Sequence, residues 1–132
     1  MGSNLTLADY FMGRDVTHAE ELDETLHTNA RVIVARANEL LRLTSRTHVR
    51  VNSGWRPRSI NAAIANASPR SRHLTCQAID LADEDGALDT WCMNNIVRLE
   101  ALGLWLEHPD ATPGWCHVQT VPPRSGRRVF RP

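Results

Sequence analysis

The longest periodic pattern in the chain is an apolar stripe in its first third, where apolar residues recur every three or four positions. This spacing predicts one amphipathic helix from about Thr17 to Leu43. Thr17 and Glu20 form a capping-box pattern at its start, with a hydroxyl at the N-cap and a carboxylate three residues later. His18 and His27 lie off the stripe, and we expect both on the surface. The stripe consists of Leu22, Leu26, Ala30, Ile33, Ala37, Leu40 and Leu41.

The rest of the pattern predicts four short strands, a short helix and a second long helix. Alternating apolar and polar residues indicate the strands, and Gly103 suits the C′ position after the second long helix. The last two strands are joined by a short loop and should be antiparallel neighbours. We therefore expect a single domain, residues 1–132, with an α+β fold in which helices back one face of a small antiparallel sheet. The expected strands are His48–Ser53, Gln77–Ala82, Leu104–His108 and Trp115–Thr120, and the expected helices are Arg58–Asn66 and Leu88–Leu102.

Three of these strands carry one ionisable side chain opposite their apolar face. Because side chains alternate along a strand, Asp80, Glu107 and His117 each point away from the apolar residues of their own strand. If the apolar faces share one core, the three polar side chains share the other side of the sheet. His73 lies in the loop before the Asp80 strand and can fold over the same surface. Two histidines and a carboxylate would hold a catalytic zinc ion with a fourth position left for water.

The same residue types also form the facial triad of non-haem iron oxygenases. In that triad the first histidine and the carboxylate usually lie close together in the sequence, whereas six residues separate His73 from Asp80. No pattern for binding a cosubstrate is evident either. The iron-oxygenase interpretation is therefore the less favoured of the two.

Composition narrows the classes of partner. The 132 residues include 15 basic and 15 acidic side chains, and this zero net charge argues against binding to a nucleic-acid backbone. No apolar run approaches the roughly 20 residues that cross a bilayer, and Met1 to Asp15 lack the pattern of a signal peptide. The three cysteines, Cys76, Cys92 and Cys116, are an odd number with no close pairing, so we expect no disulfide framework and expect them buried as small apolar residues.

Three segments resemble the motifs of a known family. Ser71 to Asp80, with the sequence SRHLTCQAID, resembles the S-x-H-x-x-G-x-A-x-D signature of zinc D-alanyl-D-alanine carboxypeptidases, dipeptidases and L-alanyl-D-glutamate endopeptidases. Ser53 to Pro57 with Asn61 resembles the family's S-G-[YW]-R…N segment, and Trp115 to Val118 resembles its W-x-H-[VF] ending. The order and spacing also match, from about Val49 to Gln119. The overall look is similar to phage-encoded members, and the family's fold is a helix-backed antiparallel sheet shared with the hedgehog signalling domain.

The resemblance implies a role for five residues. It makes His73, Asp80 and His117 the zinc ligands. It places Arg56 on the substrate side, where a guanidinium can bind a carboxylate or stabilise an oxyanion; a surface salt bridge is the alternative. Ser71 would hydrogen-bond the substrate or orient His73, or would belong to an ordinary loop turn.

The chain departs from the family pattern at two positions. Cys76 stands where the family usually has glycine, and a positive φ there would strain a cysteine. Cys76 could also be mistaken for a metal ligand. Gly114 occupies the position, three residues before the last histidine, where many members carry an acidic general base. Glu107 is the best substitute, either as the base or as a residue that orients a ligand histidine, and His108 and Asp110 are the reserves.

We therefore expect a zinc-dependent hydrolase that cleaves an amide bond in peptidoglycan stem peptides, as a D,D-carboxypeptidase or an L-alanyl-D-glutamate endopeptidase. Glu107 would take the proton of the attacking water, and Arg56 would hold negative charge on the substrate. The alternative is a non-catalytic metal-binding module of a phage particle, which Gly114 favours. We expect a monomer that is made in the host cytoplasm and acts on the cell wall after release or as a virion component, without a nucleic-acid or membrane partner.

Overall fold

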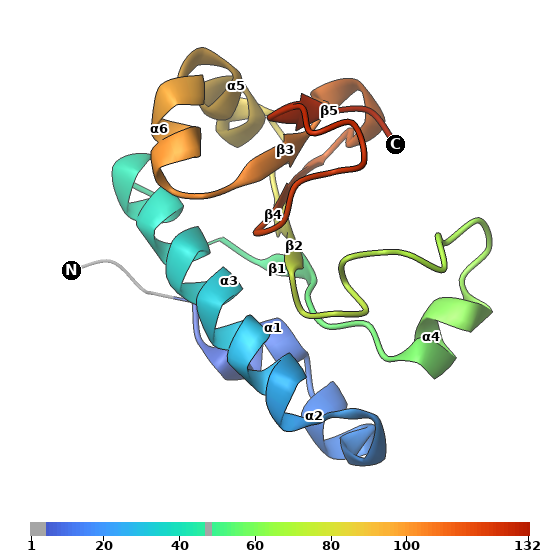
Figure 1. The fold of residues 1–132 in the computed structure, drawn as a ribbon. Helices are drawn as coiled ribbons and strands as arrows, with labels where there is room; N and C mark the ends of the chain where they lie inside the picture. The colour runs from blue at the N-terminus through green and yellow to red at the C-terminus, as the bar shows by residue number, and fades with distance from the viewer. Residues whose placement is uncertain (1–4, 47–48) are drawn as a thin grey trace.

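The computed structural model describes residues 5–46 and 49–132, and Figure 1 shows the arrangement of their helices and strands. Helices come first along the chain, and strands and helices then alternate. No helix within these two ranges is long and apolar enough to cross a membrane. The helices are α1 (Leu7–Phe11), α2 (Arg14–Thr17), η1 (Ala19–Glu21), α3 (Glu24–Leu43), α4 (Arg58–Ala63), α5 (Ala87–Asn94), α6 (Ile96–Ala101) and η2 (Pro109–Ala111), and the strands are β1 (Val51–Ser53), β2 (Ala78–Ala82), β3 (Trp105–Glu107), β4 (Trp115–Gln119) and β5 (Val129–Phe130).

The five strands form one sheet in the order β1-β2-β4-β3-β5. Neighbouring strands are antiparallel except β3 and β5, which run parallel. At the centre, β2 and β4 pair along their whole length, and Asp80 lies directly opposite His117. The predicted α+β fold and the antiparallel pairing of the strands around residues 105 and 117 are confirmed. The pattern did not predict β5, which is only two residues long.

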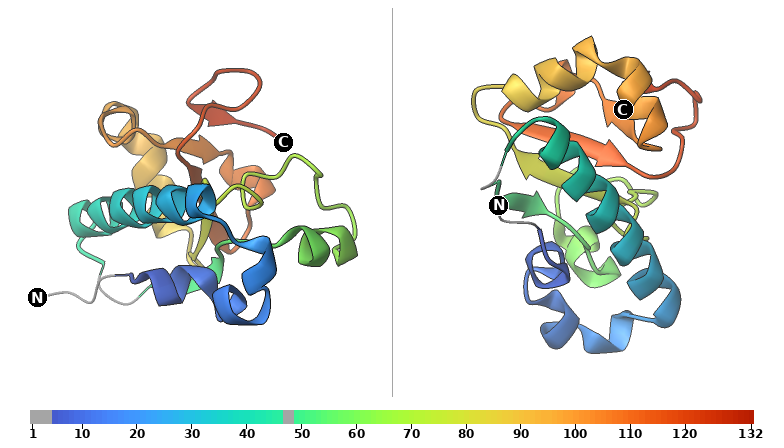
Figure 2. Two further views of the ribbon diagram at one scale, coloured as in Figure 1. Left: turned by 60° about the horizontal axis from the view of Figure 1, so that its bottom comes forward. Right: turned by 90° about the vertical axis from the view of Figure 1, so that its left-hand side faces the viewer.

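Helix α3 covers the apolar face of the sheet, as both panels of Figure 2 show, and α5 packs against β4. The alternation predicted for the last three strands is confirmed, because their core residues are fully buried and pack with the apolar stripe of α3. Aromatic residues extend this core toward the N-terminal helices, where Phe11 meets the buried Trp55 edge-to-face at 6.1 Å. The sheet residues of the core are Ile79, Leu81, Leu106, Cys116 and Val118.

The predicted long first helix begins later than expected. Thr17 ends the short helix α2, and the N-cap of α3 is Asp23, whose carboxylate accepts a hydrogen bond from the backbone N–H of Leu26 at 2.8 Å. Aspartate caps a helix at least as well as threonine. The break before Asp23 was not predicted because the apolar periodicity continues across it. His27, expected on the surface, is half-buried beside the ring of Phe11. A capping box is found instead at the start of α1, between Thr6 and Asp9.

The second predicted helix is interrupted at Asn95, which separates α5 from α6. The side-chain amide of Asn95 donates to the carbonyl of Trp91 at 2.8 Å, and such bonds compete with the regular helical pattern. Gly103 has the expected left-handed conformation after α6, with a φ of 69°. Two smaller differences concern the strands and the short helix. The latter ends at Ala63 rather than Asn66, and the predicted strand from His48 begins at Val51, with residues 47–48 outside the described ranges.

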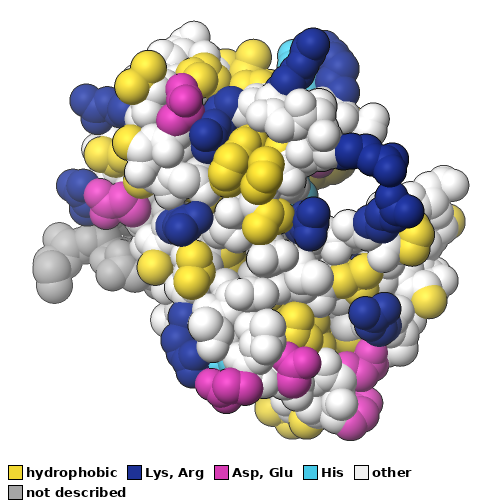
Figure 3. All heavy atoms as spheres, in the orientation of Figure 1, with side chains coloured by type: hydrophobic (Ala, Val, Ile, Leu, Met, Phe, Trp, Pro, Cys, Tyr) yellow, Lys and Arg dark blue, Asp and Glu magenta, His cyan; other side chains and the backbone are white. Residues whose placement is uncertain are grey.

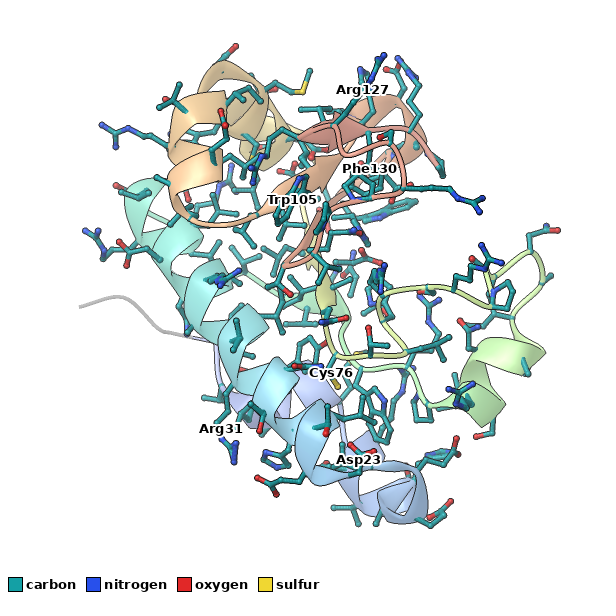
Figure 4. The ribbon with its side chains drawn as sticks, viewed as in Figure 1. Asp23, Arg31, Cys76, Trp105, Arg127 and Phe130 are labelled. Carbon is teal, nitrogen blue, oxygen red and sulfur yellow. The ribbon has the colours of Figure 1, made fainter. Side chains whose placement is uncertain are left out.

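The cysteine in the glycine position of the motif adopts the strained conformation that the pattern suggested. Cys76 has a φ of 58°, and its side chain is fully buried. Burial raises the pKa of its thiol to about 12, so it stays protonated. Figure 4 shows Cys76 near the N-terminal helices, far from Phe130 on β5. Cys76 therefore packs as a small apolar residue, and its thiol takes no part in the histidine cluster described below.

Candidate active site

Three potential metal ligands converge on the polar side of the sheet. One ligand atom from each of His73, Asp80 and His117 lies within 4.8 Å of the other two. His73 Nε2 is 3.3 Å from one carboxylate oxygen of Asp80, and His117 Nδ1 is 2.8 Å from the other. The two imidazole rings meet edge-to-face at 5.3 Å. Residues that are far apart in the sequence thus form one compact cluster.

Strand pairing accounts for two of the three positions. Asp80 on β2 and His117 on β4 are direct partners in the antiparallel register, so their side chains leave the same face of the sheet. The residues before and after each of them point into the core, which fixes the orientation of both strands. The central pair of strands therefore brings this carboxylate and this imidazole together through its register alone.

The third side chain, His73, is held by the segment that follows β1. Its Nδ1 lies 2.8 Å from the carbonyl oxygen of Gly54, and its own carbonyl accepts the backbone N–H of Arg56 at 3.0 Å. A Cβ at Gly54 would approach the carbonyl oxygen of Tyr10 to 1.9 Å, so only glycine fits there. Trp55 anchors the same segment in the core. The Ser-Gly-Trp-Arg motif thus positions His73 as well as Arg56.

The hydrogen bonds of the two imidazoles decide which nitrogen of each faces the cluster. Nδ1–H of His73 donates to the carbonyl of Gly54, so its Nε2 is the nitrogen that faces the cluster. His117 is oriented the opposite way: its Nε2–H donates to Oε1 of Gln119 at 2.8 Å, and its Nδ1 faces Asp80. The amide of Gln119 is fixed in turn by a bond to the carbonyl of Val121. Both imidazoles are therefore preset to offer a nitrogen to the same point.

The charge state of the cluster suits a cation. Burial alone would raise the pKa of Asp80, but His73 and His117 outweigh it and hold that pKa well below the usual range. Burial alone would lower the pKa of His117, but the hydrogen bond and charge of Asp80 raise it overall. Asp80 is thus an anion at every physiological pH. A metal ion would compete with a proton for His117 Nδ1.

The donor set fits zinc. Zinc binds histidine nitrogens and carboxylate oxygens at about 2.0–2.2 Å, so a tetrahedral ion separates neighbouring ligand atoms by about 3.3 Å. The ligand atoms of the three residues lie within 4.8 Å of one another, and the two oxygens of Asp80 are 3.3 and 2.8 Å from the two imidazole nitrogens. Each imidazole also has the outer hydrogen bond that is usual for a ligand histidine. Cys76 is excluded from this set because its thiol lies in the core.

Glu107 lies beside the cluster, as the strand alternation predicted. One of its carboxylate oxygens is 3.8 Å from His117 Nδ1, and its side chain is 18% exposed. Burial raises its pKa above the ordinary glutamate value. The two reserve candidates lie elsewhere, since Asp110 is exposed and pairs with Arg131 at 3.3 Å, and His108 faces the same arginine. Gly114 is exposed and brings no side chain to the cluster.

An open cleft of about 900 Å³ leads to the cluster, and both of the predicted substrate residues line it. The Arg56 guanidinium donates to Asn61 and to Ser53 and makes no ion pair in the described part of the chain. The Ser71 hydroxyl accepts the backbone N–H of His73 at 3.3 Å, which favours a role in shaping the His73 loop. Figure 3 shows the hollow on the right-hand side of the molecule, surrounded by dark blue arginine side chains.

Two site residues escaped the sequence reasoning. Gln119 shares a strand face with His117, and that spacing could have indicated its contact with the imidazole. Phe130 packs edge-to-face on His117 at 6.1 Å, and Figure 4 shows it on β5 at the end of the chain. A strand of two residues has no periodic pattern, so the contact between Phe130 and His117 could not be predicted. The parallel pairing of β5 with β3 brings it there.

Comparison of the sequence with models of known protein families identifies the family of this chain. The model of the peptidase M15 family matches residues 13–107, well over half of the 132-residue chain. The chain belongs to the peptidase M15 family. The matched range of this M15 peptidase includes His73, Asp80 and Glu107, whereas His117 lies beyond it. The comparisons with curated proteins and with solved structures returned no match. The M15 assignment and the cluster of two histidines and one aspartate agree on a metallopeptidase.

Proposed function

We propose that this M15 peptidase is a zinc-dependent hydrolase that cleaves an amide bond in peptidoglycan stem peptides, as a D,D-carboxypeptidase or an L-alanyl-D-glutamate endopeptidase. The observation that carries the proposal is the convergence of His73, Asp80 and His117 at the base of an open cleft in a member of a peptidase family. These three side chains would hold the ion. A bound zinc ion would lower the pKa of a coordinated water and polarise the scissile carbonyl.

Glu107 would serve as the general base. Its carboxylate lines the cleft next to His117, and its raised pKa brings it closer to the pH at which proton transfer is most effective. It would accept the proton of the attacking water and pass it to the leaving amine. Asp80 is already committed to the two histidines, which leaves Glu107 as the acidic side chain of the cleft available for this step.

Arg56 would bind the negative charge of the substrate. Its guanidinium is held in place by Asn61 and Ser53, and its donors that these bonds do not use can bind a carboxylate or the developing oxyanion. Ser71 would act mainly through the backbone of His73, which its hydroxyl contacts. The cleft thus offers a base beside His117 and a cation for the substrate in the segment that holds His73.

The deciding experiment is mass analysis of purified peptidoglycan fragments after incubation with the protein, with and without a chelator. Release of free D-alanine would identify a carboxypeptidase, and a newly exposed D-glutamate amine would identify the endopeptidase. Either activity should disappear with the chelator and return with added zinc. Intact fragments after incubation with the zinc-loaded protein would contradict the proposal.

A second candidate is a metal-binding module without catalytic activity, and Gly114 is the observation that favours it. Glycine at this position removes the carboxylate that many members carry three residues before the last histidine. The two candidates differ in the behaviour of a Glu107→Ala variant. Under the enzyme proposal the variant binds zinc and loses cleavage, whereas the module candidate requires that wild type and variant are equally inactive and both bind the metal.

A further inference from the structure

The cleft contains more arginine side chains than the proposed reaction requires, because that reaction assigns a role to Arg56 alone. Two acidic side chains line it, those of Asp80 and Glu107, and Asp80 is already paired with both histidines. Five arginines line the same cleft. The chain as a whole has no net charge, so this excess is local. The arginines of the cleft are Arg56, Arg70, Arg72, Arg124 and Arg131.

The structure accounts for two of the five arginines. Arg56 is hydrogen-bonded to Asn61 and Ser53, and Arg131 pairs with Asp110 at 3.3 Å. The remaining three are Arg70, Arg72 and Arg124. They are exposed, and within residues 5–46 and 49–132 none of them forms an ion pair. A cleft lined by unpaired guanidinium groups attracts anions.

These three arginines come from two separate parts of the chain. Arg70 and Arg72 lie in the loop that leads to His73, and Arg124 lies in the segment between β4 and β5. Figure 1 shows these two segments on different sides of the space beside the central strands. The second segment is fixed at its far end, because the backbone N–H groups of Leu106 and His108 donate to carbonyls of residues 128 and 130 at 2.8 and 2.7 Å.

We propose that Arg70, Arg72 and Arg124 form a second anion subsite, separate from Arg56, which selects peptides that carry a carboxylate in addition to the group that Arg56 binds. Guanidinium groups bind carboxylates through paired hydrogen bonds, and a cleft of one charge concentrates substrates of the other. The inference rests on the proposed function and adds a requirement to it: the preferred substrate is an acidic peptide. Arg124 lies beyond the residues that the family model matches.

The test uses two synthetic stem peptides that differ in one group, the α-carboxyl of the D-glutamyl residue, which is either free or amidated. Cleavage by the zinc-loaded full chain gives kcat/KM for each peptide. Binding of fluorescently labelled copies to the Glu107→Gln variant gives Kd without turnover. We expect the free carboxylate to be preferred about tenfold in both quantities, since each exposed arginine–carboxylate pair contributes about two- to fivefold.

Three variants locate the effect. Arg124→Gln and the double variant Arg70→Gln/Arg72→Gln should each reduce the preference about two- to fivefold and leave the amidated peptide nearly unaffected. Arg98→Gln is the matched control, because Arg98 is an exposed arginine on α6 outside the cleft. High salt should weaken the preference of the wild type in the same way.

The outcomes separate this inference from the proposed function. Equal binding and cleavage of the two peptides would overturn the second subsite and leave the peptidase standing. A binding preference that responds to Arg124 without cleavage of either peptide would support the subsite and contradict the proposed reaction. A preference that Arg98→Gln reduces as much as Arg124→Gln would overturn the assignment of the subsite to this cleft.

Discussion

Asp80 and Asp89 lie on opposite sides of β4, and their surroundings move their pKa values in opposite directions. Asp80 meets His117 on the polar face of the sheet, and the two histidines hold its pKa well below the usual range despite burial. Asp89 on α5 reaches the core side of the same strand, where Cys116 lies beside it. Burial, together with the nearby charge of Asp83, raises the pKa of Asp89 to about 6.

The difference lies in the partners rather than in the degree of burial. Both oxygens of Asp80 face an imidazole nitrogen, at 2.8 and 3.3 Å. One oxygen of Asp89 accepts a weak bond from the Thr112 hydroxyl at 3.3 Å, the Cys116 thiol lies beside the carboxylate, and the other oxygen has no hydrogen-bond partner within the described residues. A buried carboxylate stays ionised only where charges or donors compensate its lost hydration. Ionised carboxylates bind metals, so Asp80 on β2 is suited to a cation, whereas Asp89 on α5 is not.

The largest expected effect follows from removing the charge of Asp80. Asp80→Asn keeps the shape of the side chain and removes the anion, so we expect zinc affinity to fall at least about 100-fold and cleavage to fall to the level of the metal-free protein. Competition with a chromophoric chelator measures the affinity. Asp110→Asn, an exposed carboxylate outside the cleft, is the control. Unchanged zinc affinity in Asp80→Asn would show that the cluster does not hold the metal.

The next effect concerns catalysis without loss of the metal. Glu107→Gln removes the proposed base, and we expect kcat to fall about 10²- to 10⁴-fold while zinc affinity changes by no more than about threefold. Steady-state kinetics and the same chelator competition measure the two quantities. A variant that loses zinc together with activity would instead assign Glu107 to orienting His117, which lies 3.8 Å away.

Strand alternation predicted the centre of the site well, because it depends on local geometry alone. Asp80, Glu107 and His117 are each adjacent to buried apolar residues of their own strand. Because side chains alternate along a strand, all three must point to the face opposite the core. The position of His73 followed from the motif and not from periodicity. Its loop is fixed by Gly54 and Arg56, and these contacts between distant segments leave no period in the sequence.

The errors in the fold prediction also have local physical causes. The first helix was predicted to start at Thr17 because Leu22 and Leu26 keep the helical spacing across the break before Asp23. The second helix was predicted as continuous because the apolar spacing shows no break at Asn95, where a side-chain hydrogen bond interrupts the helix. Strand β5 was missed because two residues carry no periodic signal, although its Phe130 packs on His117.

A smaller effect is expected for Gln119, which orients His117 from the side opposite to Asp80. Gln119→Leu removes the acceptor of His117 Nε2–H and leaves a similar volume, so zinc affinity should fall about 10- to 100-fold. Gln119→Glu keeps an oxygen at that position and should retain most of the affinity. Equal zinc affinity in wild type and Gln119→Leu would mean that Phe130 and the strand alone fix the imidazole.

The smallest effect tests the other aspartate of the comparison. The folded pKa of Asp89 is about 6, whereas the ordinary aspartate value is 3.8. The folded state therefore binds more protons than the unfolded state between these values, and the contribution of Asp89 to the free energy of unfolding falls as pH rises from about 4 to about 6. The amide in an Asp89→Asn variant carries no charge at any pH. We expect Asp89→Asn to be more stable than wild type by about 1–3 kcal/mol at pH 7 and about equally stable at pH 4.

Urea unfolding at pH 4, 5, 6 and 7 measures this difference, because comparing variant with wild type at each pH removes the contribution of all other groups. Asp83→Asn provides a contrast at the start of the same helix. Both oxygens of Asp83 accept backbone N–H groups of α5, from Leu88 at 2.9 Å and from Asp89 at 2.8 Å. Removing its charge should destabilise the protein by about 0.5–2 kcal/mol at pH 7. If Asp89→Asn were instead less stable than wild type at pH 7, the carboxylate would have compensating partners, as Asp80 has, and the contrast between the two aspartates would disappear.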